Sequence, residues 1–390
     1  MKTKLFLCIC LALIGVIFFS CKENLLENKE YGKASNELTI EEAQTLLKNF
    51  RECDVQTKST TSFQINKVQK HYYPIDNRET KSSISSLTED AIPVYEFSTK
   101  ENGREGFALV LADKRIQNVL AYSSYGNLND TVFNLGLKYF VRSIPEHIKY
   151  SLDKYEKESE FKETKSSVEE NVTYHYCEIP VKWGQEYPFN MYVPCSCDDL
   201  PQKYHGRAPA GCVAVAVAQV LAYHARPQIR FRWNLLLSSQ YINEKSPDNV
   251  KREVGEMMYD IGEKVDMSYD CSGSGSYISK TQFAFAEYGY IYDLIKYYDT
   301  IGIVESIDND CPVLLSGATS HNEGHLWVVD GRRKATVDNK EQTWLMMNWG
   351  WNGINDGWFF CYDPAVFDSG NYEFNKNLTY MGNIKYNGVD

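Results

Sequence analysis

The chain has 390 residues, 43% of them hydrophobic, so it is long enough to form two or more domains that each bury a core. Its formal net charge is -11 at pH 7, and no segment is basic enough to neutralise a phosphate backbone. We therefore expect no nucleic-acid partner.

The first twenty residues have the pattern of an export signal. Two lysines precede an apolar run over residues 5–19, which is too short for a comfortable membrane span. Ser20 and Cys21 follow, and a cysteine directly after a small residue at the cleavage point resembles a bacterial lipoprotein signal. We expect residues 1–20 to be removed, Cys21 to be lipidated and residues 21–36 to form a tether. Plain secretion is the alternative.

Residues 37–153 are predicted to form a small α+β domain. Residues 37–53 begin with a helix signal, in which Thr39 is the candidate N-cap and two glutamates favour the first turn. The turn signal at residues 100–103 separates two apolar runs and indicates a hairpin. The strands expected in this domain cover residues 93–97, 106–111 and 119–123.

Residues 154–172 have few apolar side chains and a dense mixture of charges. The segment could be a solvated helix, but it lies between two folded blocks, so we interpret it as a linker that is open to proteolysis. The bond between Lys165 and Ser166 is one of several candidate cleavage points. The second domain is predicted to cover residues 173–390.

Cys212 begins a run of alternating valine and alanine whose period of two also fits a strand. A helix is favoured because alanine is the best helix former and the run continues to Pro227. A helix N-terminus stabilises a thiolate, and Gly211 removes a side chain beside the nucleophile. The alternative is an inert buried cysteine.

His325 is the candidate base for this thiol, because it follows Gly324 and begins an apolar strand that would hold the ring rigidly. His321 is a competitor four residues earlier. Acyl transfer also needs donors for an oxyanion, and the candidates are the Gln185 side chain and the backbone N–H of Cys212. Further strands are expected at residues 313–315, 326–329 and 344–347.

Taken in order, four segments resemble the streptopain-like family of papain-fold cysteine peptidases. The segments are Trp183-Gly184-Gln185 with Pro188 and Asn190, Gly211-Cys212-Val213-Ala214, Gly324-His325 with Val329-Asp330-Gly331, and Asn348-Trp349-Gly350-Trp351. The resemblance covers residues 175–390, and residues 38–150 resemble the family's inhibitory propeptide. It implies an α+β fold in which a helical subdomain and an antiparallel β subdomain follow the small α+β propeptide domain.

The resemblance also implies roles for individual residues. Cys212 is the nucleophile, His325 is the general base and then the acid, and Gln185 is an oxyanion donor. Trp349 orients the histidine, with Asn348 as the neighbouring alternative, and Trp351 shields the imidazole; the two tryptophans could also simply be core. No cofactor and no catalytic metal are implied.

Two features depart from the family pattern. Asn352 stands where the family usually has glycine, which puts the local turn in question. The insertion Cys195-Ser196-Cys197 could hold a disulfide or, with His205, a metal. Six cysteines besides Cys212 lie in the second domain, and their pairing cannot be deduced from the sequence.

Three hypotheses for the function follow. The first is an exported cysteine endopeptidase made as a zymogen, with protein or peptide substrates and its own propeptide as inhibitor. Before maturation it would be held at the bacterial outer membrane by its lipid, and after maturation it would be secreted. The second is a catalytically inactive surface protein that uses the same fold for adhesion or binding. The third is a transglutaminase-like or amidase acyl transferase.

Overall fold

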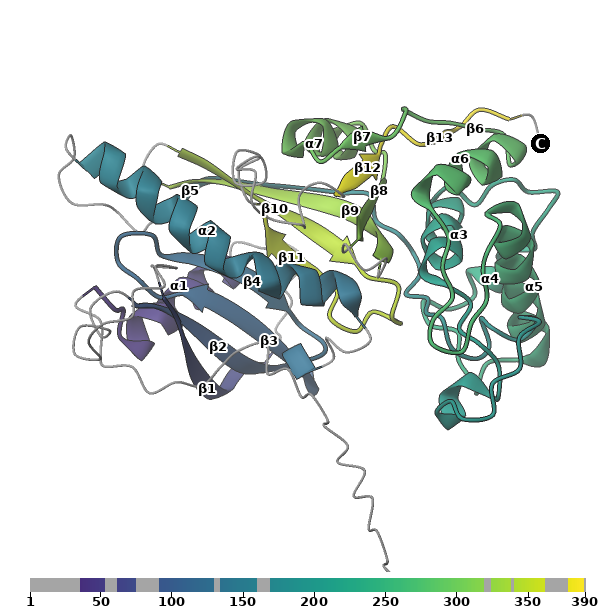
Figure 1. Ribbon diagram of the computed structural model, residues 1–390, viewed down its shortest axis with the longest axis horizontal. Coiled ribbons are helices and arrows are strands. Elements are labelled where there is room, and N and C mark those ends of the chain that lie inside the picture. Colours follow the sequence, from purple (N-terminus) through teal and green to yellow (C-terminus); the bar gives the residue numbers. More distant parts are fainter. Residues whose placement is uncertain are drawn as a thin grey trace, which may run out of the picture.

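The structure is a computed structural model that describes residues 36–52, 62–74, 91–129, 134–159, 169–318, 324–337, 340–361 and 378–388. Figure 1 shows a large sheet with helix α2 lying along it, and beside the sheet a separate group of helices. Among the described residues, no helix is long and apolar enough to cross a membrane. The predicted signal, Cys21 and the tether up to residue 35 lie outside the described residues.

The N-terminal domain contains the predicted helix and hairpin. The Thr39 hydroxyl accepts from the Glu42 N–H at 3.1 Å while the Glu42 carboxylate accepts from the Thr39 N–H at 2.7 Å, which is a capping box. Asn102 and Gly103 both have positive φ, as a two-residue hairpin turn requires. The elements are α1 Ile40–Glu52, β1 Phe63–Pro74, β2 Ala91–Glu101, β3 Arg104–Leu111, β4 Asn118–Ser123 and α2 Leu135–Ser159.

Strand β1 and helix α2 of this domain were not predicted, because each contains a local irregularity in its sequence pattern. Strand β1 has a register shift between Ile65 and Lys67, which interrupts the alternation of side chains that identifies a strand. Helix α2 contains Pro145, a residue that normally ends a helix. It also runs into the charged segment that we interpreted as a linker. Residues 154–159 belong to α2 and β5 starts at Glu170, so the predicted linker is shortened to residues 160–169, of which 160–168 lie outside the described residues.

The second domain begins with a strand that was not predicted, β5, and then largely follows the predicted order of helices first and strands later, with helix α7 among the strands. Its helices are η3 Gln202–Tyr204, α3 Cys212–His224, α4 Trp233–Leu236, α5 Asp248–Lys264, α6 Ile278–Glu287 and α7 Thr300–Asp308. Its strands are β5 Glu170–Tyr176, β6 Tyr290–Ile291, β7 Lys296–Tyr297, β8 Val313–Ala318, β9 Gly324–Val337, β10 Lys340–Asn348, β11 Gly357–Phe360, β12 Thr379–Met381 and β13 Lys385–Tyr386.

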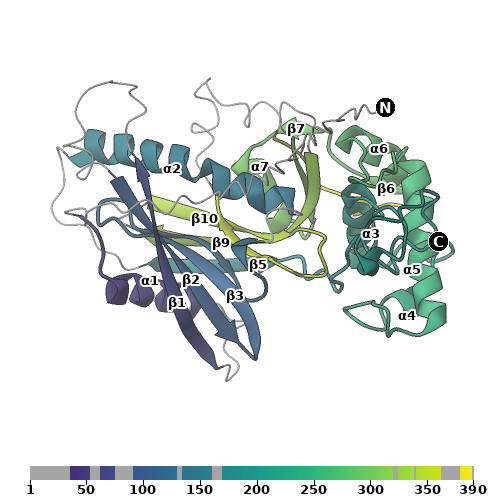
Figure 2. The same ribbon diagram turned by 60° about the horizontal axis from the view of Figure 1, so that its bottom comes forward.

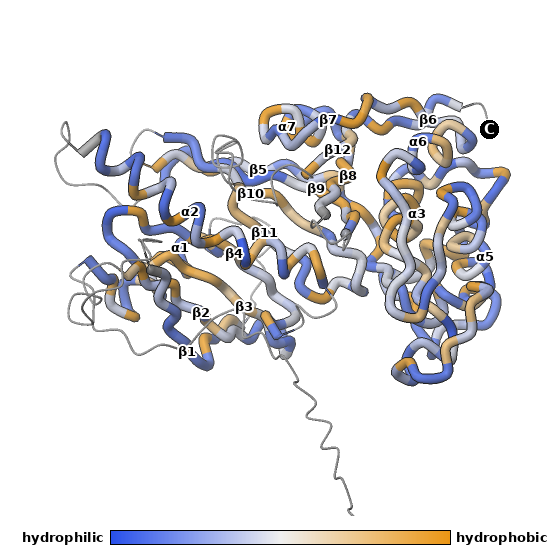
Figure 3. Tube along the Cα trace, viewed as in Figure 1, coloured by the Kyte–Doolittle hydropathy of each residue, from blue (hydrophilic) through white to orange (hydrophobic). Residues whose placement is uncertain are grey.

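Helix α3 is the centre of the helical subdomain. Every residue from 213 to 222 is buried, and Figure 3 shows α3 as one of the most apolar helices. Its small side chains let α5, α6 and β9 pack around it. The prediction of a helix rather than a strand is confirmed, and a helix buried on all sides explains why an amphipathic period was missing.

The two domains share one sheet. Within the described part of the chain it has eleven strands, in the order β1-β2-β3-β4-β11-β10-β9-β8-β12-β7, with β5 paired to β9. The junction is the antiparallel pair β4–β11, in which Trp358 lies opposite Tyr122 and Phe359 opposite Ala121. Figure 2 shows β1–β3 continuing into the layer of β9 and β10. The N-terminal domain is therefore built into the edge of the second domain.

Aromatic side chains and one buried cation fill the junction. The Phe50 ring of α1 lies 5.3 Å from the Trp344 ring of β10, centroid to centroid. The fully buried Arg333 guanidinium lies 4.0 Å from the Phe50 centroid and 4.4 Å from that of Trp344, and it forms an ion pair with Glu169. Such a buried, mixed interface holds the two domains in one arrangement.

Candidate active site

Cys212 is the first residue of α3 and follows Gly211, which has φ +94°. A Cβ on Gly211 would lie 2.6 Å from the Met267 sulfur, so glycine is required there. The Cys212 side chain is partly exposed, yet burial raises the pKa of the thiol. Hydrogen bonds from backbone groups, foremost that of Leu326, oppose this effect. The thiol therefore lies beside the start of β9.

His325 is the second residue of β9 and is 4% exposed. Its Nε2 lies 2.9 Å from the Trp349 carbonyl oxygen, and only a protonated nitrogen can donate to a carbonyl. The proton is therefore on Nε2, which leaves Nδ1 as the basic nitrogen. Burial lowers the pKa of His325 to about 4, although the Trp349 carbonyl favours the charged form. The ring is neutral at pH 7.

The structure thus brings Cys212 and His325 into one site, since the Leu326 backbone next to His325 lies close enough to the thiol to oppose the rise of its pKa. The competitor His321 lies outside the described residues. Among the hydrogen bonds of the described residues, none joins the thiol to the imidazole, and the His325 ring is instead held by Trp349.

Tryptophans surround the imidazole. The Trp351 ring is nearly parallel to the His325 ring, with centroids 6.3 Å apart and an interplanar angle of 13°, where a shielding residue was expected. The Trp327 ring is also nearly parallel to the His325 ring, with centroids 5.9 Å apart and an interplanar angle of 16°. This contact was not predicted from the sequence, because Trp327 falls inside an apolar strand. Trp349 contacts the imidazole through its carbonyl, while its indole N–H donates to the Asn355 carbonyl at 2.9 Å.

A buried charged network holds the Trp349 peptide unit. One Asp356 oxygen accepts from the Trp349 N–H at 2.9 Å and the other lies 2.9 Å from Lys182 Nζ. Burial lowers the pKa of Lys182, but the charges of Asp356 and Asp330 and the hydrogen bond to Asp356 together outweigh burial and raise the pKa. Nearby, burial raises the pKa of Asp330 to about 6, and the Lys182 charge opposes that rise. The alternative orienting residue, Asn348, instead accepts from Gln219 at 3.0 Å.

The Gln185 segment lies against the nucleophile. The Gln185 carbonyl accepts from the Ala210 N–H at 2.9 Å, two residues before Cys212, and its side chain is buried. Asn352 holds this segment from the other side, because its N–H donates to the Trp183 carbonyl at 3.0 Å. Asn352 has φ +55°, the left-handed conformation that glycine and asparagine tolerate best, so the local turn is formed despite the departure from glycine.

Helix α2 of the N-terminal domain covers the site. A Cβ on Gly136 would lie 2.3 Å from Trp349 Cζ3 and 3.1 Å from His325 Cδ2, so the first turn of α2 is in contact with both residues. Asn134 begins this turn, with Oδ1 accepting from the Leu137 N–H at 3.0 Å. Neither residue was identified from the sequence, because a single glycine in a helix carries no local signal of a distant contact.

Comparison with known proteins agrees with this geometry. Residues 183–359 match the Peptidase C10 family, and residues 35–148 match the Spi protease inhibitor family. The second domain is therefore similar to the streptopain-like C10 peptidases, and the domain before it is similar to the Spi protease inhibitors.

The chain is also similar to individual proteins. Streptopain of Streptococcus pyogenes is 28% identical over 311 residues, which cover 68% of this chain and 72% of streptopain. The thiol protease/hemagglutinin PrtT of Porphyromonas gingivalis is 22% identical over 78% of this chain and 39% of its own length. A solved fragment of Prevotella intermedia prointerpain A superposes with a TM-score of 0.54 at 18% identity, covering 82% of this chain and all of the fragment. The predicted α+β, papain-like fold and the resemblance to the streptopain-like family are confirmed.

Proposed function

We propose that this protein is the zymogen of a cysteine endopeptidase that hydrolyses peptide bonds in proteins. The observation that carries the proposal is the joint position of three groups. A cysteine begins a buried helix, the Leu326 backbone next to His325 lies close enough to the thiol to oppose the rise of its pKa, and the Ala210 N–H two residues before the cysteine donates to the Gln185 carbonyl. The match to the Peptidase C10 family supports the class of reaction.

The chemistry follows from these positions. His325 Nδ1 takes the thiol proton, and the Cys212 thiolate attacks the substrate carbonyl carbon. The Cys212 N–H and the Gln185 side chain donate to the oxygen that becomes negative. The imidazolium then protonates the leaving amine, and water hydrolyses the acyl-enzyme with His325 again as base. Trp349 fixes the tautomer through its carbonyl, and Trp351 shields the ring.

The N-terminal domain acts as the inhibitor in this proposal. Helix α2 touches His325 through Gly136, and strand β4 completes the sheet beside β11. In the precursor, burial disfavours both the thiolate and the imidazolium, so the pair is neutral and unreactive. Cleavage within residues 160–169, between α2 and β5, and departure of the domain would let water and substrate reach the site. Export with a lipid on Cys21 is part of the same proposal.

The proposal is tested by labelling the nucleophile before and after activation. The precursor without residues 1–21 is treated with iodoacetamide at pH 7, either intact or after a trace of trypsin has cut the linker. Because the pKa of the thiol is raised in the intact protein, we expect Cys212 to react at least about tenfold more slowly there than in the cut protein. Casein hydrolysis should appear on cutting and disappear in step with labelling of Cys212. A cut protein that is inactive while Cys212 stays unreactive would favour a binding protein on this fold.

Acid is expected to weaken the precursor through His147. This histidine lies on the buried side of α2, 5.1 Å from the Phe360 ring of β11 between centroids, and burial lowers its pKa to about 3. A pKa below the ordinary 6.5 means that the unfolded chain binds more protons, so stability is present above pH 6.5 and is lost as the pH falls toward 3. By pH 4.5 the free energy of unfolding should fall by about 2–3 kcal/mol from this group.

The measurement is urea unfolding in a Cys212→Ala background, which prevents self-cleavage. His147→Leu should lose less stability than its parent between pH 6.5 and 4.5 and run parallel to it between pH 6.5 and 8. Parallel curves over the whole range would show that His147 does not carry the acid sensitivity.

A further inference from the structure

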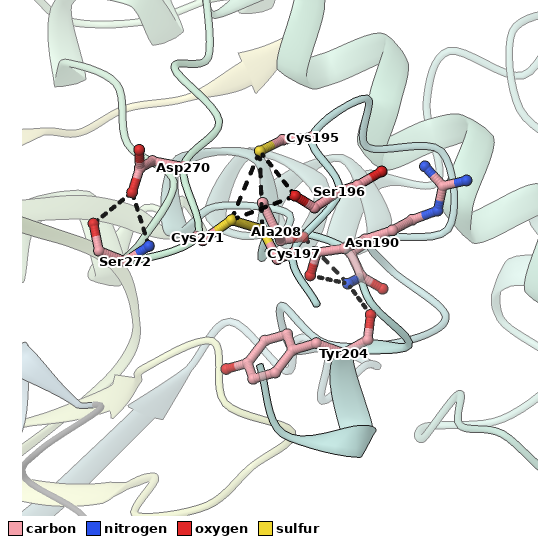
Figure 4. Close-up of a disulfide and its surroundings, with 10 residues drawn as sticks. Asn190, Cys195, Ser196, Cys197, Tyr204, Ala208, Asp270, Cys271 and Ser272 are labelled. Atoms are coloured by element: carbon pink, nitrogen blue, oxygen red, sulfur yellow. Dashed lines mark hydrogen bonds between the residues drawn. A yellow bond between two sulfur atoms is a disulfide. The ribbon is translucent and has the colours of Figure 1, made fainter. Parts of the chain in front are cut away.

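The sulfurs of Cys195, Cys197 and Cys271 all lie within 4.8 Å of one another (Figure 4). Cys197 and Cys271 form a disulfide across 74 residues of sequence. The Cys195 sulfur is a free thiol that lies 3.8 Å from the Cys197 sulfur and 4.0 Å from the Cys271 sulfur. A thiol is therefore in contact with both ends of a disulfide.

The backbone explains why two cysteines face the same partner. The Cys195 carbonyl accepts from the Ala208 N–H at 3.0 Å, and the Cys197 N–H donates to the Gly206 carbonyl at 2.8 Å. The segment is thus paired in extended conformation, in which side chains two residues apart share a face. Cys195 and Cys197 consequently present their sulfurs to Cys271 from one rigid segment.

Solvent reaches this cluster from one side. Cys197 is 3% exposed, whereas Cys195 is partly exposed and Cys271 is exposed. The thiol that would act as nucleophile and the sulfur that it would attack are therefore both accessible to water and to base.

We propose that Cys195 and Cys197 exchange as the partner of Cys271, so that the disulfide moves between two pairings. Cys195 loses its proton, and its thiolate attacks the Cys271 sulfur. The new Cys195–Cys271 bond forms as the Cys197–Cys271 bond breaks, and Cys197 leaves as a thiolate that takes up a proton. One thiol and one disulfide exist before and after, so no oxidant or reductant is consumed. Cys195 must first rotate about its Cα–Cβ bond, since exchange proceeds in line with the breaking bond.

A metal at the cluster is a weaker interpretation. His205, which we considered as a ligand from the sequence, stacks on the Tyr187 ring at 4.0 Å between centroids and lies 3.6 Å from Glu244. Among the described residues, the group that can share an ion contains only the three cysteines, two of which are already joined to each other. Exchange needs no ligand beyond these three sulfurs.

The exchange has a consequence for the site, which rests on the proposed function. Cys271 belongs to the loop between α5 and α6, which is closed by paired hydrogen bonds of 3.0 Å between Ser268 and Gly275. Met267 and Ser274 of this loop approach Gly211, directly before the nucleophile. A change of partner from Cys197 to Cys195 shifts the anchor of this loop by two residues along the paired segment, and with it one wall beside Cys212.

The test uses the full chain with Cys212→Ala, so that its outcome is independent of any peptidase activity. After incubation at pH 8 and acid quenching, free thiols are blocked with N-ethylmaleimide, and disulfides are then reduced and alkylated with iodoacetamide. Trypsin leaves Cys195 and Cys197 in one peptide, and fragment ions assign the label. We expect maleimide on both cysteines within about tenfold of each other, with none on Cys271. Maleimide on Cys195 alone, however long the incubation, would overturn the proposal.

Single substitutions give a second measurement. Cys197→Ser should form the Cys195–Cys271 disulfide and leave Cys271 unlabelled, and Cys195→Ser should keep the Cys197–Cys271 disulfide. Ser196→Ala, at the exposed position between them, is the matched control and should divide the label as its parent does. Maleimide on both Cys195 and Cys271 of Cys197→Ser would show that the second pairing does not form.

Discussion

Replacement of Cys212 by alanine is expected to abolish both self-processing of the precursor and hydrolysis of casein. The thiol is the group that forms the acyl-enzyme, and no other described nucleophile shares the start of α3 with the Leu326 backbone and His325. A nucleophile and its base depend on each other for catalysis. Removal of the nucleophile therefore lowers kcat/KM by more than about 10⁴-fold. The measurement is the rate of casein hydrolysis after trypsin has cut the linker.

Cys311→Ala is the matched control, because Cys311 is also a free cysteine of the second domain but is buried away from the site before β8. We expect it to retain activity, apart from a small loss of stability. Circular dichroism of both variants shows whether they are folded. Casein hydrolysis by folded Cys212→Ala at the wild-type rate would remove the peptidase assignment of this cysteine.

The second large effect is expected from Gly136→Leu, which should activate the precursor before it is cut. A Cβ alone would lie 2.3 Å from the Trp349 ring, so the first turn of α2 must move away from the site. Overpacking of this kind costs about 1–3 kcal/mol. A cost of that size, paid only while α2 contacts the site, raises the fraction of precursor molecules in which α2 has moved away from the site by about 5- to 150-fold. The initial rate of casein cleavage by the uncut precursor, before conversion, measures this fraction.

Lys149→Leu is the control for this substitution, because Lys149 is exposed on the same helix and a leucine there meets no site residue. Its uncut precursor should show the same lag as the wild type, that is, the same time before casein hydrolysis begins. If folded Gly136→Leu keeps the same lag, contact of α2 with Trp349 and His325 does not inhibit the enzyme. Inhibition would then have to come from the other contact between the two domains, the pairing of β4 with β11.

Local chemistry made several parts of this protein predictable. Thr39 caps α1 because a hydroxyl and a glutamate three residues later satisfy free N–H groups, whatever the rest of the chain does. Asn102-Gly103 turns the hairpin because these residues tolerate positive φ. The run after Cys212 is long and rich in alanine, and it forms a helix. The family could also be identified, since its motifs are short and local.

Contacts between distant segments were decided only by the tertiary structure. Trp349 was expected to orient the imidazole, but nothing in the sequence says whether its ring or its carbonyl does so. The position of Gly136 on the site, the pairing of β4 with β11 and the choice of Cys197 for Cys271 likewise join residues far apart in the chain. Secondary structure follows from neighbouring residues, whereas such contacts depend on how buried surfaces of the whole chain fit together. The sequence therefore determined the chemical groups of this protein, and the packing of its two domains decided which of them meet.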